Sequence, residues 1–225
     1  MRQRDGDFAL VRHPHSSDPG SNLPAAGSFT LMGVRLGVAD HLGWAVAVTA
    51  AADHAVVDRR RNELVAPGVS AAPIHYQRGR LDIAATAALV AKVRASVMRM
   101  SSAALDDLAA ALPAPVVSIS LRFWPPDFPD DIATQRRAPY EARADAIMYR
   151  HLLAELAHAR GWEVHCYDAK HVEAQAADLL GERADEVLRG PRATLGPPWT
   201  KDHRMALAAT VVAGEGRHGA AVAGY

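Results

Sequence analysis

The hydrophobic pattern near the start of the chain has the two-residue period of β-strands. Val34, Leu36 and Val38 alternate with small or polar residues, as in a strand with one buried face. A turn and the apolar run 44–48 predict a returning strand, and residues 55–65 predict a third. The chain therefore opens with a predicted antiparallel meander of three strands.

Apolar residues then recur at helical spacing in four segments. Residues 81–112 predict a long helix with a break near Ser101, and residues 140–160 predict a second long helix. Shorter patterns predict a small helix over residues 172–180 and a last helix over residues 201–213.

Two short apolar runs, residues 116–123 and 163–168, each follow a helical segment. This placement is typical of parallel strands in an α/β sheet. A proline-rich loop over residues 124–131 follows the first of them. The predicted fold class is α/β, a mixed sheet in which the antiparallel three-stranded meander is followed by two parallel strands, flanked by helices.

Composition limits the organisation and the function. The length of 225 residues suits one sizeable domain, predicted over residues 31–213, between a disordered tail over residues 1–30 and a flexible tail over residues 214–225. Lys+Arg and Asp+Glu are both 25, which excludes a polybasic binder acting through bulk charge. The single cysteine excludes an intrachain disulfide. No signal peptide or membrane span is recognised, so we expect a cytoplasmic protein.

Four short motifs follow one another along the chain, and their order is more informative than any one of them. Leu36-Gly-Val-Ala-Asp40 precedes the returning strand, residues 116–123 form the later apolar strand, Tyr167-Asp-Ala-Lys-His-Val172 follows, and Lys201-Asp-His-Arg-Met-Ala-Leu-Ala-Ala209 opens the last helix. Together these motifs resemble the ribonuclease H-like superfamily, and within it the RuvC-like branch of Holliday-junction resolvases. The resemblance spans roughly residues 33–213.

The resemblance implies hydrolysis of phosphodiesters in branched or structured nucleic acid, with two Mg²⁺ or Mn²⁺ ions as cofactors. Asp40 and Asp202 match metal-binding acids of the family, and His203 is placed to assist catalysis. Lys170 and Lys201, two of only three lysines, are candidates for contacting phosphate. A homodimer is possible under this interpretation, and no membrane partner is expected.

Two departures from the family leave the activity open. Ser120 and Met205 stand where the family has further acids, and His41 is a candidate substitute ligand or base. Three interpretations follow: a metal-dependent nuclease-like hydrolase; an inactive ribonuclease H-like domain that binds nucleic acid or protein; and a distant relative of actin-like ATPases. The third is disfavoured because no Gly-rich phosphate loop of the required form is present and the chain is short.

Several other side chains have competing interpretations. Glu141, Asp145 and Tyr149 share one helical face and form either a source of a substitute acid or a solvated surface. Cys166 is predicted to be a small buried residue. The arginines at 59–61 are predicted either to contact a phosphate backbone or to form a solvated edge.

Overall fold

The structure is a computed structural model that describes residues 33–76 and 79–215. The predicted tail over residues 1–30 lies outside these ranges, as do residues 216–225 of the predicted C-terminal tail. The last helix continues to Glu215, two residues further than the hydrophobic pattern predicts. No helix within the described ranges is both long enough and apolar enough to cross a membrane.

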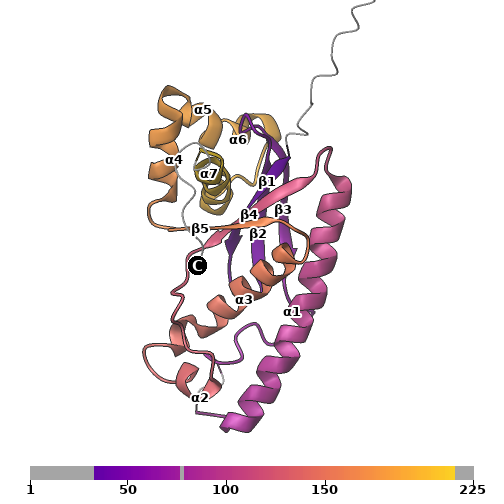
Figure 1. Ribbon diagram of the computed structural model, residues 1–225, viewed down its shortest axis with the longest axis vertical. Helices are drawn as coiled ribbons and strands as arrows, with labels where there is room; N and C mark the ends of the chain where they lie inside the picture. Colours follow the sequence, from indigo (N-terminus) through magenta and orange to yellow (C-terminus); the bar gives the residue numbers. More distant parts are fainter. Residues whose placement is uncertain (1–32, 77–78, 216–225) are drawn as a thin grey trace, which may run out of the picture. The chain divides into compact units, whose positions relative to one another are not determined.

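A five-stranded mixed sheet forms the centre of the fold (Figure 1). Its strand order is β3-β2-β1-β4-β5; β2 runs antiparallel to β1 and β3, whereas β4 is parallel to β1 and β5 is parallel to β4. The predicted fold class is therefore confirmed. The strands are β1 Val34–Asp40, β2 Trp44–Ala50, β3 Val56–Glu63, β4 Val116–Arg122 and β5 Glu163–Tyr167.

Helices cover both faces of this sheet, as Figure 1 shows. Two long helices, α1 Ile83–Ala111 and α3 Glu141–His158, pack together on one face. The other face is covered by α4 Val172–Leu180 and α7 Lys201–Glu215, which pack against each other. Shorter elements complete the fold: α2 Ile132–Gln135, the 3₁₀ helix η1 Gly181–Arg183, α5 Ala184–Arg189 and α6 Pro191–Leu195.

The hydrophobic core consists of two layers, one on each side of the sheet. Leu36 and Val38 of β1 belong to the layer under α1 and α3, and Ala39 belongs to the layer under α7. Successive side chains of a strand point to opposite faces, so a strand covered on both faces is apolar at nearly every position. The same alternation puts Asp40, the last residue of β1, on the face of Leu36 and Val38.

Two sequence predictions about these elements are wrong. The long helix α1 is continuous through Ser101. The carbonyl and hydroxyl oxygens of the next residue, Ser102, accept hydrogen bonds from Arg160, which support the helix at this point. Cys166 is exposed rather than buried. It lies on β5, an edge strand with a neighbour on one side only, and its side of the strand is less covered than that of Tyr167.

Gly37 sets how closely α7 approaches the sheet. A Cβ atom at Gly37 would lie 1.9 Å from the carbonyl oxygen of Ala206 on α7. Real Cβ atoms do not approach backbone oxygens this closely, so any larger residue would push the helix away from β1. The position of the N-terminus of α7, which carries Asp202, depends on this contact.

We expect Gly37→Ala to lower the free energy of unfolding by about 1–3 kcal/mol, the usual cost of overpacking a core. Chemical denaturation of the two proteins measures the difference. Ala95→Ser, which adds one atom at an exposed position of α1, is the matched control and should change stability little. Equal stability of the Gly37 variant and the wild type would contradict the prediction.

Candidate functional site

Asp40 ends β1 with its carboxylate almost fully buried, at 1% exposure. Its neighbours in the same row of side chains are Leu36 and Val38, both in the core. A carboxylate in such a place must be paired or hydrogen-bonded, because transfer of a lone charge from water into a protein interior is very costly.

Two arginines supply the opposite charge. Arg150 of α3 donates a hydrogen bond from Nε to Asp40 Oδ2 at 2.9 Å, and from Nη1 to the carbonyl oxygen of Phe123 at 3.1 Å. Arg122, the last residue of β4, has its Nε 3.8 Å from Asp40 Oδ1. Asp40 is thus held between guanidinium groups from a helix and a neighbouring strand.

Asp202 reaches the same place from the first turn of α7. Its Oδ2 lies 3.0 Å from His41 Nε2, and its Oδ1 lies 3.7 Å from Arg122 Nη2. Because an ionised carboxylate only accepts hydrogen bonds, His41 must donate from Nε2. Asp40 and Asp202, which the resemblance makes metal-binding acids, therefore share Arg122 as a neighbour within 4 Å of each carboxylate.

We call Asp40, His41, Arg122, Arg150 and Asp202 the Asp40 cluster. It combines two carboxylates with two guanidiniums, so its formal charge is zero when His41 is neutral. The two arginines of this cluster are what the sequence analysis missed. Arg122 follows Ser120 by two residues and shares its strand face, but pairing with β1 and α7 is a tertiary contact that no local pattern predicts.

The donor set of this cluster does not fit two divalent cations. No group of three His, Cys, Asp or Glu side chains in the described ranges is arranged to hold a metal ion. A charge pair 4 Å apart near a protein surface interacts by about 4 kcal/mol, so a dication beside Arg122 or Arg150 would meet roughly twice that repulsion. The carboxylates already have cations as neighbours.

The two positions without the expected acids are parts of the core beneath α7. Ser120 is buried, and its hydroxyl donates to the carbonyl oxygen of Ala209 at 3.2 Å. Met205 is buried among the apolar residues that α7 packs against the sheet. These side chains fasten the last helix to β4 and have no oxygen directed towards the cluster.

His203 has a structural task at the start of α7. Its Nδ1 accepts a hydrogen bond from the backbone N–H of Thr200 at 3.2 Å and lies 2.9 Å from the Thr200 hydroxyl. Thr200 in turn accepts the backbone N–H of Arg204, which makes Thr200 the N-cap. Burial and the charge of Arg59 lower the pKa of His203. Because Nδ1 accepts the Thr200 N–H, its lone pair is occupied and this atom is not a free base.

The two candidate lysines are both exposed. Lys201 is the first residue of α7 and directly precedes Asp202, so it lies beside the Asp40 cluster. Lys170 lies in the turn after β5, where its backbone N–H donates to Asp168 Oδ1 at 2.8 Å. A role for either lysine in contacting phosphate remains a prediction.

The Trp44 ring, next to the cluster, stacks against the ring of His41 and the guanidinium of Arg61. The His41 ring lies parallel to Trp44 at a centroid distance of 4.0 Å, and the Arg61 guanidinium lies 4.0 Å from the Trp44 ring. These neighbours come from the β1–β2 turn and from β3, on opposite sides of β2. The stack fixes the side chain that donates to Asp202.

A hollow of about 400 Å³ opens beside this stack, lined by Trp44, Val46, residues 59–61, Pro198, Thr200, Asp202 and His203. Of the predicted arginine run, Arg60 pairs with Asp58 and Arg61 pairs with Glu63. Arg59 instead donates to the carbonyl oxygens of Leu195, Gly196 and Pro198. It holds the loop before α7 in place.

The shared helical face of Glu141, Asp145 and Tyr149 is buried rather than solvated. Asp145 accepts the backbone N–H groups of Ile74 and His75 at 3.0 and 2.9 Å, and the Tyr149 hydroxyl donates to the carbonyl oxygen of Ala71 at 2.8 Å. Burial raises the pKa of Asp145, and these two hydrogen bonds oppose the increase. The face anchors the segment between β3 and α1.

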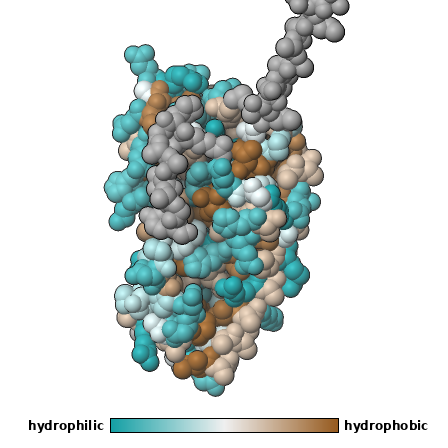
Figure 2. Space-filling model, in the orientation of Figure 1, coloured by the Kyte–Doolittle hydropathy of each residue, from teal (hydrophilic) through white to brown (hydrophobic). Residues whose placement is uncertain are grey.

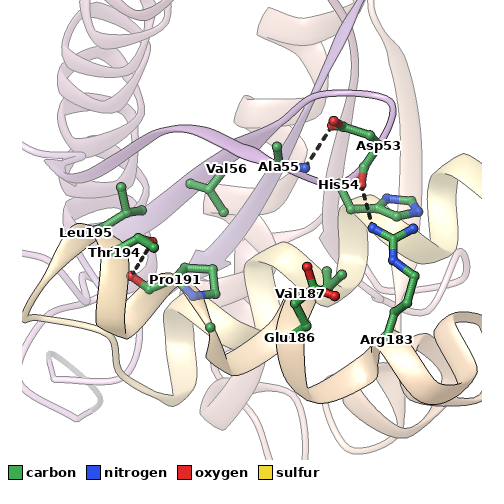
Figure 3. A pocket seen from close by; sticks show the side chains of 11 residues that line it. Asp53, His54, Ala55, Val56, Arg183, Glu186, Val187, Pro191, Thr194 and Leu195 are labelled. Carbon is green, nitrogen blue, oxygen red and sulfur yellow. Dashed lines mark hydrogen bonds between the residues drawn. The ribbon is translucent and has the colours of Figure 1, made fainter.

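A second hollow lies at the opposite end of β2 and β3 (Figure 3). It has a volume of about 400 Å³ and includes His54, a buried residue with a positive φ of 72° in the β2–β3 turn. Arg183 donates to the carbonyl oxygen of Asp53 at its edge. Burial lowers the pKa of His54, which favours a neutral ring there.

The strand order and the helices on both faces define an α/β domain built on a mixed five-stranded sheet. No protein-family model and no curated protein matches the chain. The chain is similar to two solved structures of RuvC from Thermus thermophilus. One, a complex with a Holliday junction substrate, is 15% identical with a TM-score of 0.43; the other is 16% identical with a TM-score of 0.41. Each match covers 83% of this chain and 96% of the RuvC chain.

Arg150→Met should lower the free energy of unfolding by about 3–5 kcal/mol, because it leaves the buried Asp40 carboxylate without its hydrogen-bonded cation. Denaturant titration measures the loss. Arg143→Met on the same helix removes an exposed guanidinium and should be nearly neutral. Adding Asp40→Asn to Arg150→Met should recover part of the stability; similar losses in the two arginine variants would contradict the ion-pair assignment.

Stability should fall with acidification. Burial lowers the pKa of His54, His151 and His203 from 6.5, so below pH 6.5 the unfolded chain binds more protons than the folded chain, and unfolding becomes easier as the pH falls. Denaturant titrations at about pH 7.5 and about pH 5 measure this loss. His203→Gln, whose amide oxygen can still accept the Thr200 N–H, should lose less stability than the wild type over the same interval. An unchanged pH dependence in that variant would contradict the role of His203.

Proposed function

We propose that this domain is a ribonuclease H-like module that binds nucleic acid without hydrolysing it. The ion pair between Arg150 and the buried Asp40 carboxylate carries the proposal. In this ion pair Asp40, the first of the two predicted metal-binding acids, serves to stabilise the fold. The competing interpretation, a nuclease-like hydrolase that uses Mg²⁺ or Mn²⁺, requires Asp40 and Asp202 to be metal ligands.

The remaining groups of the cluster support a structural role as well. The Asp202 carboxylate accepts a hydrogen bond from His41 and lies near Arg122. The Nδ1 atom of His203 accepts the N-cap hydrogen bond. General acid–base catalysis needs a side chain whose proton or lone pair is directed at the reacting atoms, and these contacts direct both groups towards other protein atoms.

Nucleic acid is the favoured partner because an exposed lysine and an exposed aromatic ring lie near the end of the sheet at which β1 and β4 finish. Phe123 follows β4 with 58% exposure, and Arg150 binds its carbonyl oxygen. Lys201 is exposed at the start of α7, where helix N–H groups favour an anion. Single-stranded nucleic acids bind through such cations together with aromatic rings on which bases stack. The overall charge of zero limits this attraction to the local surface.

The full chain should bind four-way-junction DNA or single-stranded RNA at low salt, equally in EDTA and in Mn²⁺, and should cleave neither. Binding should weaken as salt rises because phosphate contacts release counterions. Lys201→Gln and Phe123→Ala should each weaken binding several-fold in a fluorescence-anisotropy titration.

Lys92→Gln, an exposed lysine of α1, is the matched control and should bind like the wild type. Gel analysis of the same substrates after long incubation tests for cleavage. Mn²⁺-dependent cleavage that Asp40→Asn abolishes would establish the hydrolase instead. Absence of binding to every substrate at low salt would leave a protein-interaction module as the better description.

A further inference from the structure

A third hollow lies away from the Asp40 cluster, between α1, α2, α3 and the proline-rich loop. Its volume is about 370 Å³, within the lower part of the range of small-molecule sites, roughly 300–1,000 Å³. Figure 1 shows these three helices below the sheet. Figure 2, in the same orientation, shows hydrophobic residues on the lower part of the molecular surface, beside α1.

The floor of this hollow is apolar and belongs to the core. Ile74, Val90, Phe128, Ile147 and Met148 line it, and each is at least nine-tenths buried. They come from four separate segments of the chain, so the hollow is a product of tertiary packing. Such a floor favours an apolar group of a ligand, because burial of apolar surface is favourable in proportion to its area.

The rim, by contrast, is polar and carries two opposite charges. Arg94 of α1 and Asp130 of the proline-rich loop are exposed, and both lie close enough to His151 to affect its pKa. Within the described ranges, neither Arg94 nor Asp130 forms an ion pair, with each other or with any other residue. Arg94 and Asp130 are thus two charges of opposite sign at the mouth of one hollow.

The rim is also held in a fixed position. Gln135 donates to the carbonyl oxygen of Pro129 at 2.7 Å, and Asp131 accepts the backbone N–H of Thr134 at 2.8 Å as the N-cap of α2. Arg136 donates to the carbonyl oxygen of Leu81 before α1. Burial lowers the pKa of His151, whose ring meets Trp124 edge-on. These contacts fix the backbone around Asp130, so a ligand needs little backbone reordering to bind there.

We infer that this hollow binds a small apolar zwitterion, an α-amino acid with an apolar side chain. Its carboxylate would pair with Arg94, its ammonium group would pair with Asp130, and its side chain would fill the apolar floor. An anion alone would leave Asp130 unpaired beside it, and a cation alone would do the same with Arg94. A ligand with both charges complements both residues of the rim. This inference is independent of the proposed nucleic-acid binding.

Calorimetric titration of the full chain with L-phenylalanine and L-leucine tests the inference. We expect saturable binding of at least one of them and none of L-serine, which lacks the apolar group. 3-Phenylpropanoate, without the ammonium group, and 2-phenylethylamine, without the carboxylate, should each bind about tenfold more weakly or worse, because each lacks one charge-assisted contact.

Arg94→Gln and Asp130→Asn should each weaken amino-acid binding about tenfold or more. Both residues are exposed, so neither change should unfold the domain. Arg99→Gln, which removes another exposed arginine of α1 outside the hollow, should bind like the wild type. The inference is overturned if neither amino acid binds, if 3-phenylpropanoate binds as tightly as phenylalanine, or if Arg94→Gln and Arg99→Gln behave alike.

Discussion

A buried carboxylate requires a nearby positive charge, and this constraint organises the contacts around Asp40 at the C-terminal end of β1, the central strand. The strand pattern of β1 directs the Asp40 side chain towards the core. A metal ion and a guanidinium are alternative ways to compensate such a charge. In this domain Arg150 binds the carboxylate directly, and Arg122 lies beside it. A guanidinium is part of the chain and is always protonated, so this compensation does not depend on a cofactor.

The same constraint joins parts of the chain that are distant in sequence. Arg122 lies at the end of β4 and contacts Asp40 on β1 and Asp202 on α7. The sheet edge and the last helix are thereby connected by charge as well as by the close approach at Gly37. Loss of a common arginine would affect both layers together, since neighbouring ion pairs in one network are not independent.

Much of the fold was predictable because it follows from local periodicity. The alternation of Val34, Leu36 and Val38 predicts β1, and the helical spacing within residues 140–160 predicts α3. The prediction of a break in α1 at Ser101 failed because local propensity disfavours serine in helices, whereas Arg160 stabilises the continuous helix from outside it. The short helices α5 and α6 were not predicted, since segments of five or six residues carry too few apolar positions for a period to be recognised.

The site was less predictable than the fold, because the role of each side chain depends on which distant residues it contacts. The positions of Asp40 and Asp202 in motifs predicted that the two residues meet, and they share the contact with Arg122. Nothing in the local sequence distinguishes Arg150 from the other arginines on the exposed faces of helices. Glu141 and Asp145 follow a helical spacing that also fits a solvated face, and only the packing of residues 71–75 against α3 shows that the face is buried.

The hydrogen bonds of Arg59 have a consequence for how this domain tolerates sequence change. One guanidinium on β3 donates to all four carbonyl oxygens from Leu195 to Pro198. Carbonyl groups are present whatever the side chains are, so these hydrogen bonds do not restrict the residue types of this connection; only Gly196, with a positive φ of 72°, is restricted by its own backbone. The length of the connection is not free, because an inserted or deleted residue would move the carbonyl groups away from the fixed fork of donors. We therefore regard this connection as a spacer of defined length, unsuited to insertions or to new chain termini, although it is a loop at the surface.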